Sequence, residues 1–229
     1  MLGPCINASG RLDTAARSLA LLNAKTKEEA ARLAGDLTAL NQSRKALTEK
    51  GKEEAIRIIE TTELKNDRVL VVYLPDCHES LAGIIAGRIR EKYHRPAFVL
   101  TGGETSAKGS GRSIESYSMY EELVKCADLM IQFGGHPMAA GLSIEEKNIE
   151  EFRRRLNVNC TLTDEELRPK IVIDVPMPVS YITKELVEQI SLLEPFGKGN
   201  TKPVFAQKNL RVLDHSIIGK NKNVVKLKL

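Results

Sequence analysis

VLVVYLPDCHESLAGIIAGRIREKYHRPAFVL, residues 69–100, is the stretch that decides the fold of this chain. It opens with an apolar, β-branched run that ends at Pro75, which is typical of a buried strand in an α/β unit. A helix is expected over residues 80–93, and a second short strand over residues 97–100, after Pro96. The order strand, helix, strand indicates an α/β fold class.

The same alternation continues along the chain. A helix is expected near residues 119–127, a strand near 129–133 and a further helix near 148–156. Strands that alternate with helices over this length predict a compact α/β domain with a mixed sheet.

The N-terminal part is helical in pattern. Between residues 12 and 59, apolar residues recur at spacings of three and four, and charged residues fill the other faces. We expect a short N-terminal helix and then one or two long connecting helices. Continuation across Gly51 would cost about 1 kcal/mol.

The C-terminal part is β-rich in pattern. Residues 171–175 predict a strand, residues 184–193 a helix, and residues 204–229 two or three further strands. The last predicted strand stops without a turn, and the glycine-rich segment at residues 3–13 has no element before it. The chain is therefore expected to be a piece of a larger protein.

Composition excludes several classes of protein. The net charge of +4 permits a nucleic-acid partner but does not argue for one. The four cysteines form no CxxC pair, so reduced thiols are expected rather than a disulfide framework or a zinc site. No secretory signal opens the chain, and no apolar run approaches the ~18 residues of a membrane span. A soluble, cytoplasmic protein with no membrane partner is expected.

The segment AKGSGRS, residues 107–113, predicts a phosphate-binding loop. Gly109 and Gly111 would let successive backbone N–H groups point into one concavity and bind an anion. Arg112 adds a planar fork that suits paired phosphate oxygens, and Lys108 adds a point charge. The candidate residues are Lys108, Gly109, Ser110, Gly111, Arg112 and Ser113. An ordinary polar hairpin is the alternative, because glycine and serine favour turns.

The segment FGGHPMAAGLSI, residues 133–144, is the second candidate. Gly134 and Gly135 predict a tight turn after a strand, and Pro137 suits the start of a helix. His136 is the reactive group, although a lone histidine is often a structural hydrogen-bonding residue. Two glycine-framed loops that each follow a strand favour one shared site, since ligands collect at strand ends.

Cys77 and His78 suggest a metal ligand pair or a nucleophile. No partner residue stands at ligand spacing, so burial around the start of the following helix is favoured.

Four motifs occur in an order and spacing that resemble those of the RecJ family of the DHH superfamily: GPCINASGRLDTA, KGSGRS, FGGHPMAAGLSI and LEPFGKGN. The resemblance covers essentially the whole chain. It implies the end of a catalytic DHH domain and a helical connector at 1–65, a DHH-associated α/β domain at 66–160, and a partial OB-fold-like domain at 161–229.

The resemblance also implies an activity. RecJ enzymes digest single-stranded DNA from the 5′ end, in DNA repair and recombination, with Mn²⁺ or Mg²⁺ held by aspartates and histidines of the DHH domain. No DHH triplet occurs in this sequence. This piece is therefore expected to bind single-stranded DNA without hydrolysing it and to hold no metal. A helicase or a single-strand-binding protein is a further expected partner.

Particular residues match the family's motifs. Ser110 and Arg112 match its SxR motif, and His136 matches its GGH motif, so Arg112 and His136 are the expected catalytic residues. Asn7 and Arg11 lie in the motif that helps to receive the 5′ end. Cys5 stands where many members have arginine, which puts that contact in doubt. The expected DNA-binding residues are Asn7, Arg11, Lys108, Gly109, Ser110, Gly111, Ser113, Gly134 and Gly135.

The OB-like region is basic but poor in aromatic residues, so its binding is expected to be electrostatic rather than by base stacking. Its basic residues are Lys198, Lys202, Lys208, Arg211, Lys220, Lys222, Lys226 and Lys228. Two other functions stay open. One is a small-nucleotide phosphodiesterase of the same superfamily, which the connector and the OB-like region argue against. The other is a non-catalytic nucleic-acid-binding module.

Overall fold

The computed structural model describes residues 2–219 and 221–229. The chain divides into two compact units, Met1–Pro169 and Lys170–Leu229. Within the described residues, no helix is long and apolar enough to cross a membrane.

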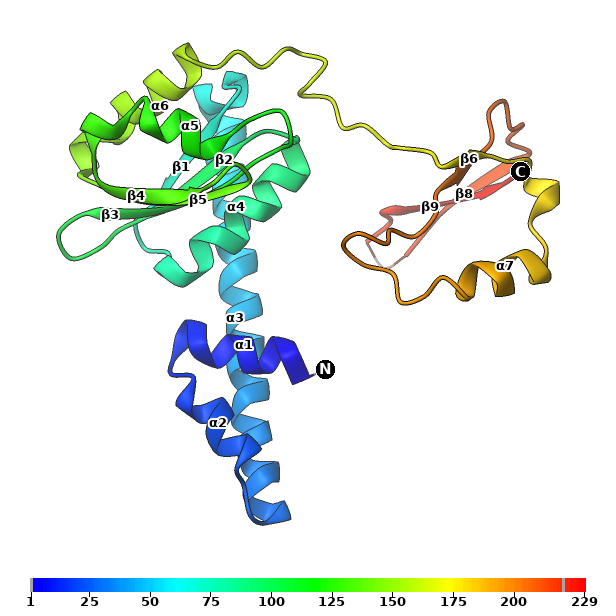
Figure 1. Cartoon of the computed structure of the whole chain (residues 1–229), viewed down its shortest axis with the longest axis horizontal. Coiled ribbons are helices and arrows are strands. Elements are labelled where there is room, and N and C mark those ends of the chain that lie inside the picture. Colours follow the sequence, from blue (N-terminus) through cyan, green and yellow to red (C-terminus); the bar gives the residue numbers. More distant parts are fainter. Residues whose placement is uncertain (1, 220) are drawn as a thin grey trace. The chain divides into compact units, whose positions relative to one another are not determined.

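Three helices open the first unit: α1 (Leu2–Leu12), α2 (Ala16–Leu22) and α3 (Lys27–Thr61) (Figure 1). The hydroxyl of Thr26 caps α3 by accepting a hydrogen bond from the backbone N–H of Glu29. The helix then runs for 35 residues and passes Gly51 without a break. This agrees with the expectation of a short helix followed by a long connecting one.

A mixed sheet follows, as the sequence predicted, and it has five strands in the order β1-β2-β3-β5-β4. Its strands are β1 (Leu70–Leu74), β2 (Ala97–Thr101), β3 (Ala107–Arg112), β4 (Met130–His136) and β5 (Ala139–Ile144). Strands β1 and β2 are parallel and are joined by α4 (Glu79–Tyr93), whereas β3, β4 and β5 pair antiparallel.

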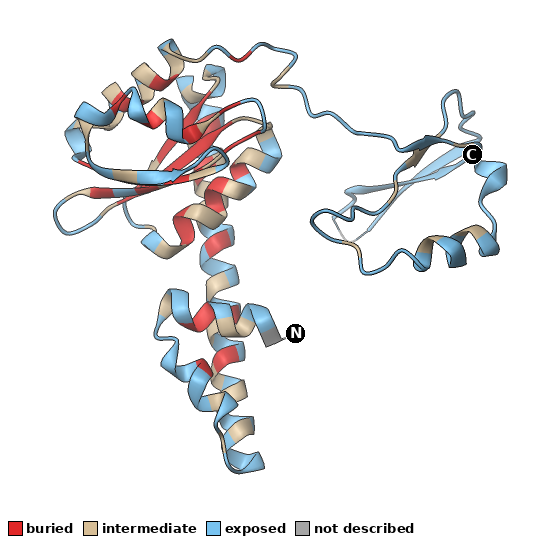
Figure 2. Cartoon of the chain, in the orientation of Figure 1, coloured by how far each residue is buried: buried red, intermediate tan, exposed pale blue. Residues whose placement is uncertain are grey.

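Helices cover the two faces of this sheet (Figure 1). One core lies between β1, β2, α3 and α4, where Ile59, Ile85 and Val72 are fully buried. The other core lies under α5 (Met119–Val124) and α6 (Ile149–Val158), where the rings of Phe98 and Phe152 meet edge to face at 5.4 Å. Buried residues follow the strands and the inner helix faces of this unit (Figure 2).

Two predicted loops are strands in the structure. Residues 107–112 form β3 instead of a phosphate loop, and residues 133–144 form most of the β4–β5 hairpin instead of a turn followed by a helix. Both segments are rich in small residues, and their strand conformation comes from pairing with their neighbours in the sheet.

The second unit consists of short elements. They are β6 (Val175–Pro176), α7 (Lys184–Ser191), β7 (Phe205–Ala206), β8 (Asp214–Ile218) and β9 (Val224–Lys228). The strand expected at 171–175 reduces to β6, while the helix and the three later strands occur near their predicted places. Short 3-10 helices also occur, in both units, at Glu63–Asn66, Ala127–Leu129, Glu146–Asn148 and Val179–Tyr181.

Candidate nucleic-acid interface

The side chains of β3 alternate between the two faces of the sheet. Lys108, Ser110 and Arg112 lie on the face that α4 packs against, while Gly109 and Gly111 are buried toward the α5 and α6 side. The candidate polar residues therefore share one face because they occupy every second position of a strand.

The two glycines of β3 have a packing role. A Cβ atom on Gly111 would lie 2.5 Å from Met119 Sδ and 2.6 Å from Phe98 Cε1. Neither glycine has a positive φ, and β3 is paired on both sides, with β2 and with β5. Its backbone N–H groups are used within the sheet. The prediction that Gly109 and Gly111 free these amides to cradle a phosphate is therefore wrong.

Ser113 is also placed differently from the prediction. It is buried, and its hydroxyl donates a 2.5 Å hydrogen bond to the backbone carbonyl of Tyr117. Its backbone N–H donates to Met138 O at 2.9 Å. This residue fixes the end of β3 next to the β4–β5 turn and offers no donor to a ligand.

The β4–β5 hairpin brings the GGH segment onto the same face as Arg112. His136 of β4 pairs with Ala139 of β5, and Ala139 pairs in turn with Arg112 of β3. His136 is exposed, and its Nδ1 lies 3.3 Å from the Met138 backbone N–H. Gly135 has a φ of +152°, and a Cβ there would lie 2.4 Å from the carbonyl oxygen of Ala139. A glycine is thus required at 135 for the hairpin to close.

Three rows of residues cross this face from β3 over β5 to β4. Each row consists of residues that are paired in register, so its side chains project to the same side. Row one is Arg112, Ala139 and His136; row two is Ser110, Gly141 and Gly134; row three is Lys108, Ser143 and Gln132.

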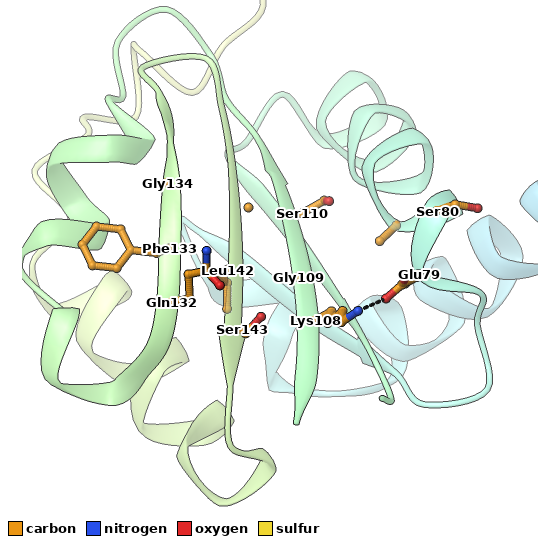
Figure 3. A pocket seen from close by; sticks show the side chains of 12 residues that line it. Glu79, Ser80, Lys108, Gly109, Ser110, Gln132, Phe133, Gly134, Leu142 and Ser143 are labelled. Carbon is orange, nitrogen blue, oxygen red and sulfur yellow. Dashed lines mark ion pairs between the residues drawn. The ribbon is translucent and has the colours of Figure 1, made fainter. Parts of the chain in front are cut away.

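A pocket of about 510 Å³ lies over rows two and three and reaches the first turn of α4 (Figure 3). Its lining residues are Glu79, Ser80, Ala82, Lys108, Gly109, Ser110, Gln132, Phe133, Gly134, Gly141, Leu142 and Ser143. Arg112 and His136 stand one row beyond it. The expected DNA-binding residues Lys108, Gly109, Ser110 and Gly134 therefore line this pocket, and the two expected catalytic residues flank it.

Arg112 reaches from the sheet to α4. Its Nη1 donates to the carbonyl oxygen of Gly111 at 2.7 Å, and the guanidinium lies against the backbone of Gly83. A Cβ on Gly83 would lie only 2.6 Å from Arg112 Nη2. Burial, and next the nearby charge of Arg11, lower the pKa of Arg112. This guanidinium is held in place and partly desolvated.

Arg11 approaches the same place from α1. Its Nη1 donates to the carbonyl oxygen of Ser80, in the first turn of α4, at 2.8 Å. Asn7 lies one helical turn earlier and is exposed. Among the residues that the structure describes, neither Arg11 nor Arg112 forms an ion pair with a carboxylate. Two uncompensated guanidinium groups therefore lie near the start of one helix, which suits an oxyanion such as phosphate.

Lys108 differs from the two arginines because it is already paired. Its Nζ lies 2.7 Å from Glu79 Oε2, and the hydrogen bond to Glu79 raises the pKa of Lys108. The dashed line in Figure 3 marks this pair at the edge of the pocket. Lys108 of row three is thus neutralised by Glu79 of α4, whereas Arg112 of row one has no such partner among the described residues.

The sequence reasoning missed the lining residues Glu79, Ser80, Gln132 and Ser143. It also missed Gly83, which lies against the guanidinium of Arg112. A glycine inside the predicted helix at position 83 was the one available signal, because glycine there needs a packing or functional reason. The other residues carry no motif, and only the sheet register brings them to the pocket.

Of the pair expected to be buried at this helix start, Cys77 is half-buried against the core, whereas His78 is exposed. His78 is the N-cap of α4, and its Nδ1 accepts from the Ser80 backbone N–H at 3.2 Å. Burial raises the pKa of the Cys77 thiol. Within residues 2–219 and 221–229, no group of three or more His, Cys, Asp or Glu side chains is placed to hold a metal ion.

The basic residues of the second unit are exposed wherever the structure describes them, and Lys220 lies outside the described residues. Lys226 and Lys228 alternate with Val225 and Leu227 along β9, so they share one face of the β8–β9 hairpin.

Family models match both parts of the chain. The DHHA1 domain matches residues 66–160, and the RecJ OB domain matches residues 173–229. The first model covers the five-stranded sheet with α4, and the second covers the β-rich second unit.

Curated relatives extend the match to almost the whole chain. The single-stranded-DNA-specific exonuclease RecJ of Bacillus subtilis is 36% identical over 230 residues, which is 99% of this chain and 29% of that protein. The protein of the same name from Escherichia coli is 36% identical over 228 residues, which is 95% of this chain and 39% of that protein. The chain thus spans well under half the length of these relatives.

A solved structure has the same fold. The crystal structure of RecJ in complex with Mn²⁺ from Thermus thermophilus matches 99% of this chain and 35% of that chain, with a TM-score of 0.80 and 28% identity. Motifs, domain matches and fold agree, so this chain is a homologue of part of the RecJ exonucleases and carries a DHHA1 domain and a RecJ OB domain.

Proposed function

We propose that this chain forms the strand-gripping side of a single-stranded-DNA-specific 5′-to-3′ exonuclease. The observation that carries this proposal is the pair of uncompensated guanidinium groups, Arg11 and Arg112, beside the first turns of α4. Matches to exonucleases named for single-stranded DNA supply the substrate class. A helicase or a single-strand-binding protein is the protein partner that such an enzyme would meet.

Arg112 and His136 of row one, together with Arg11 of α1, each have a defined task in this proposal. Arg112 binds two oxygens of one phosphate, and Arg11 supports the same charge from α1. His136 lies in the same row on β4, where a ring N–H donates a hydrogen bond to the DNA. During hydrolysis, Arg112 stabilises the charge that develops on the phosphoryl oxygens.

The metal chemistry would come from elsewhere in such an enzyme. The described residues do not fit Mn²⁺ or Mg²⁺, since they hold no suitable group of ligands. Related structures were solved with these ions. We therefore expect this chain alone to bind single-stranded DNA and to leave it uncleaved when Mn²⁺ is added.

Fluorescence anisotropy with the complete chain and a 3′-labelled single strand tests the proposal. Arg112→Ala should weaken binding about 10-fold or more, because a charge-assisted contact is lost. The plot of log affinity against log salt should become shallower by about 0.7, the value for one phosphate contact on a single strand.

Arg88→Ala is the matched control. Arg88 lies on α4, the helix that Arg112 contacts, but it pairs with Glu91 at 2.9 Å, so its loss should change binding little. Equal affinity of wild type and Arg112→Ala at low salt would remove Arg112 from the interface. No binding by the wild type at low salt would overturn the proposed function as a whole.

A further inference from the structure

We infer that row three, at the far end of the pocket, is a subsite for a nucleobase of the strand whose phosphate lies at row one. Its base-binding residues are Gln132 and Ser143. This inference rests on the proposed function and extends it from the phosphate to the base.

The spacing of the rows fits an extended strand. Rows one and three are separated by four residues of β3, from Arg112 to Lys108. At a rise of about 3.4 Å per residue this is roughly 14 Å. A single strand of DNA that lies along β3 and β5 therefore passes all three rows.

Packing within the protein does not require glycine at the two glycine positions of row two, Gly134 and Gly141. A Cβ on Gly134 would meet nothing within 4 Å, and one on Gly141 would meet only Gly109 O at 3.8 Å. Gly111 and Gly135, in contrast, are demanded by close neighbours. The absence of side chains at 134 and 141 keeps the groove open between the two ends.

The charge at each row indicates which part of a nucleotide can bind there. Row one has an unpaired guanidinium, which suits phosphate. At row three the carboxylate of Glu79 neutralises Lys108 at 2.7 Å and would repel a second phosphate there. A neutral group with hydrogen-bonding edges is the better ligand for this end.

Gln132 and Ser143 provide such hydrogen bonds. Within the described part of the chain, neither side chain has a hydrogen-bond partner, and both line the pocket next to each other on paired strands. Figure 3 shows them on the β4 and β5 side, opposite the Lys108–Glu79 pair. A glutamine amide both donates and accepts, and a serine hydroxyl does the same, so together they suit the edge of a base.

The test compares variants by fluorescence anisotropy on the complete chain. The probe is a short 3′-labelled single strand, used intact and with abasic nucleotides. Gln132→Ala and Ser143→Ala should each lower affinity for the intact strand about 3- to 10-fold, as expected for one neutral hydrogen bond. Their salt slopes should equal that of the wild type, because no phosphate contact is lost. On the abasic strand, both variants should bind as the wild type does.

Matched controls are available on α3. Gln42 and Ser43 are exposed there and lie outside the rows, so Gln42→Ala and Ser43→Ala should leave binding unchanged. Wild-type affinity of Gln132→Ala and Ser143→Ala on the intact strand would overturn the inference. So would an equal loss on the intact and abasic strands. If Arg112→Ala still weakens binding in that case, the proposed function stands while the base subsite fails.

Discussion

Arg112 on β3 and His136 on β4 stand in one row of the sheet, each paired in register with Ala139 of β5, which lies between them. Neighbouring strands lie about 4.8 Å apart, so the two backbones are separated by roughly 10 Å. The residue between them in this row, Ala139, has only a methyl side chain. In the proposed complex, the sugar-phosphate chain passes over this alanine, between the guanidinium and the imidazole.

Gly83→Ala should weaken DNA binding without destabilising the protein. The added methyl group would lie 2.6 Å from Arg112 Nη2, so it should push the guanidinium out of place. We expect affinity for single-stranded DNA to fall several-fold in fluorescence anisotropy. The helix itself should gain up to about 1 kcal/mol from the replacement of glycine.

Gly87→Ala is the control for this prediction. Gly87 lies on the same helix, one turn further, and a Cβ there meets nothing within 4 Å. It should stabilise the protein in thermal unfolding and leave affinity unchanged. Equal affinities of the two variants would show that Arg112 does not need its place against Gly83.

Gly111→Ala should destabilise the first unit. Its Cβ would overlap the ring of Phe98 and the sulfur of Met119, both fully buried. Overpacking of this kind costs typically 1–3 kcal/mol, so roughly that loss is expected in urea unfolding. Gly35→Ala, on α3 with open space around the new Cβ, is the matched control. A wild-type unfolding free energy for Gly111→Ala would contradict the packing role of this glycine.

Glu79→Gln should strengthen DNA binding. The change releases Lys108 from its 2.7 Å ion pair and removes a negative charge from the groove. We expect higher affinity and a steeper dependence on salt, because a further phosphate contact becomes possible. Glu91→Gln on the same helix removes an equal charge beside Arg88 and should have little effect. Weaker binding by Glu79→Gln would mean that the carboxylate itself contacts the strand.

Glu151 should contribute to stability in a way that depends on pH. Hydrogen bonds from Arg154 and then Arg155 lower the pKa of Glu151 from 4.5 to about 2. Since the folded-state value is lowered, the contribution is present above the unfolded value of 4.5 and is lost as the pH falls toward about 2.

Thermal unfolding of wild type and Glu151→Gln across this range provides the measurement. The difference in melting temperature should be constant near neutral pH and should shrink as the pH falls below about 4.5. Glu115 is exposed and forms no ion pair in the described part of the chain, so Glu115→Gln should show no such trend. A difference that stays constant down to low pH would contradict the role of the arginines.

The local pattern was sufficient for the first half of the fold. The apolar run before Pro75 predicted β1, and the segment after it predicted α4 and β2, because each signal lies within a few neighbouring residues. Strands β3 and β5 were missed, since glycine, serine and alanine have little intrinsic preference for strands. Their conformation is imposed by the strands on either side.

By itself, the sequence determined that Arg112, His136 and Arg11 belong to recognisable motifs, and that strands and helices alternate around them. The tertiary structure decided how the polar residues are presented, because hydrogen bonding on both sides of β3 uses its amides and leaves only alternate side chains for a ligand. It also decided which residues outside the motifs line the same groove. Gln132 and Ser143 reach the groove through strand register, which is a long-range property that no local pattern encodes.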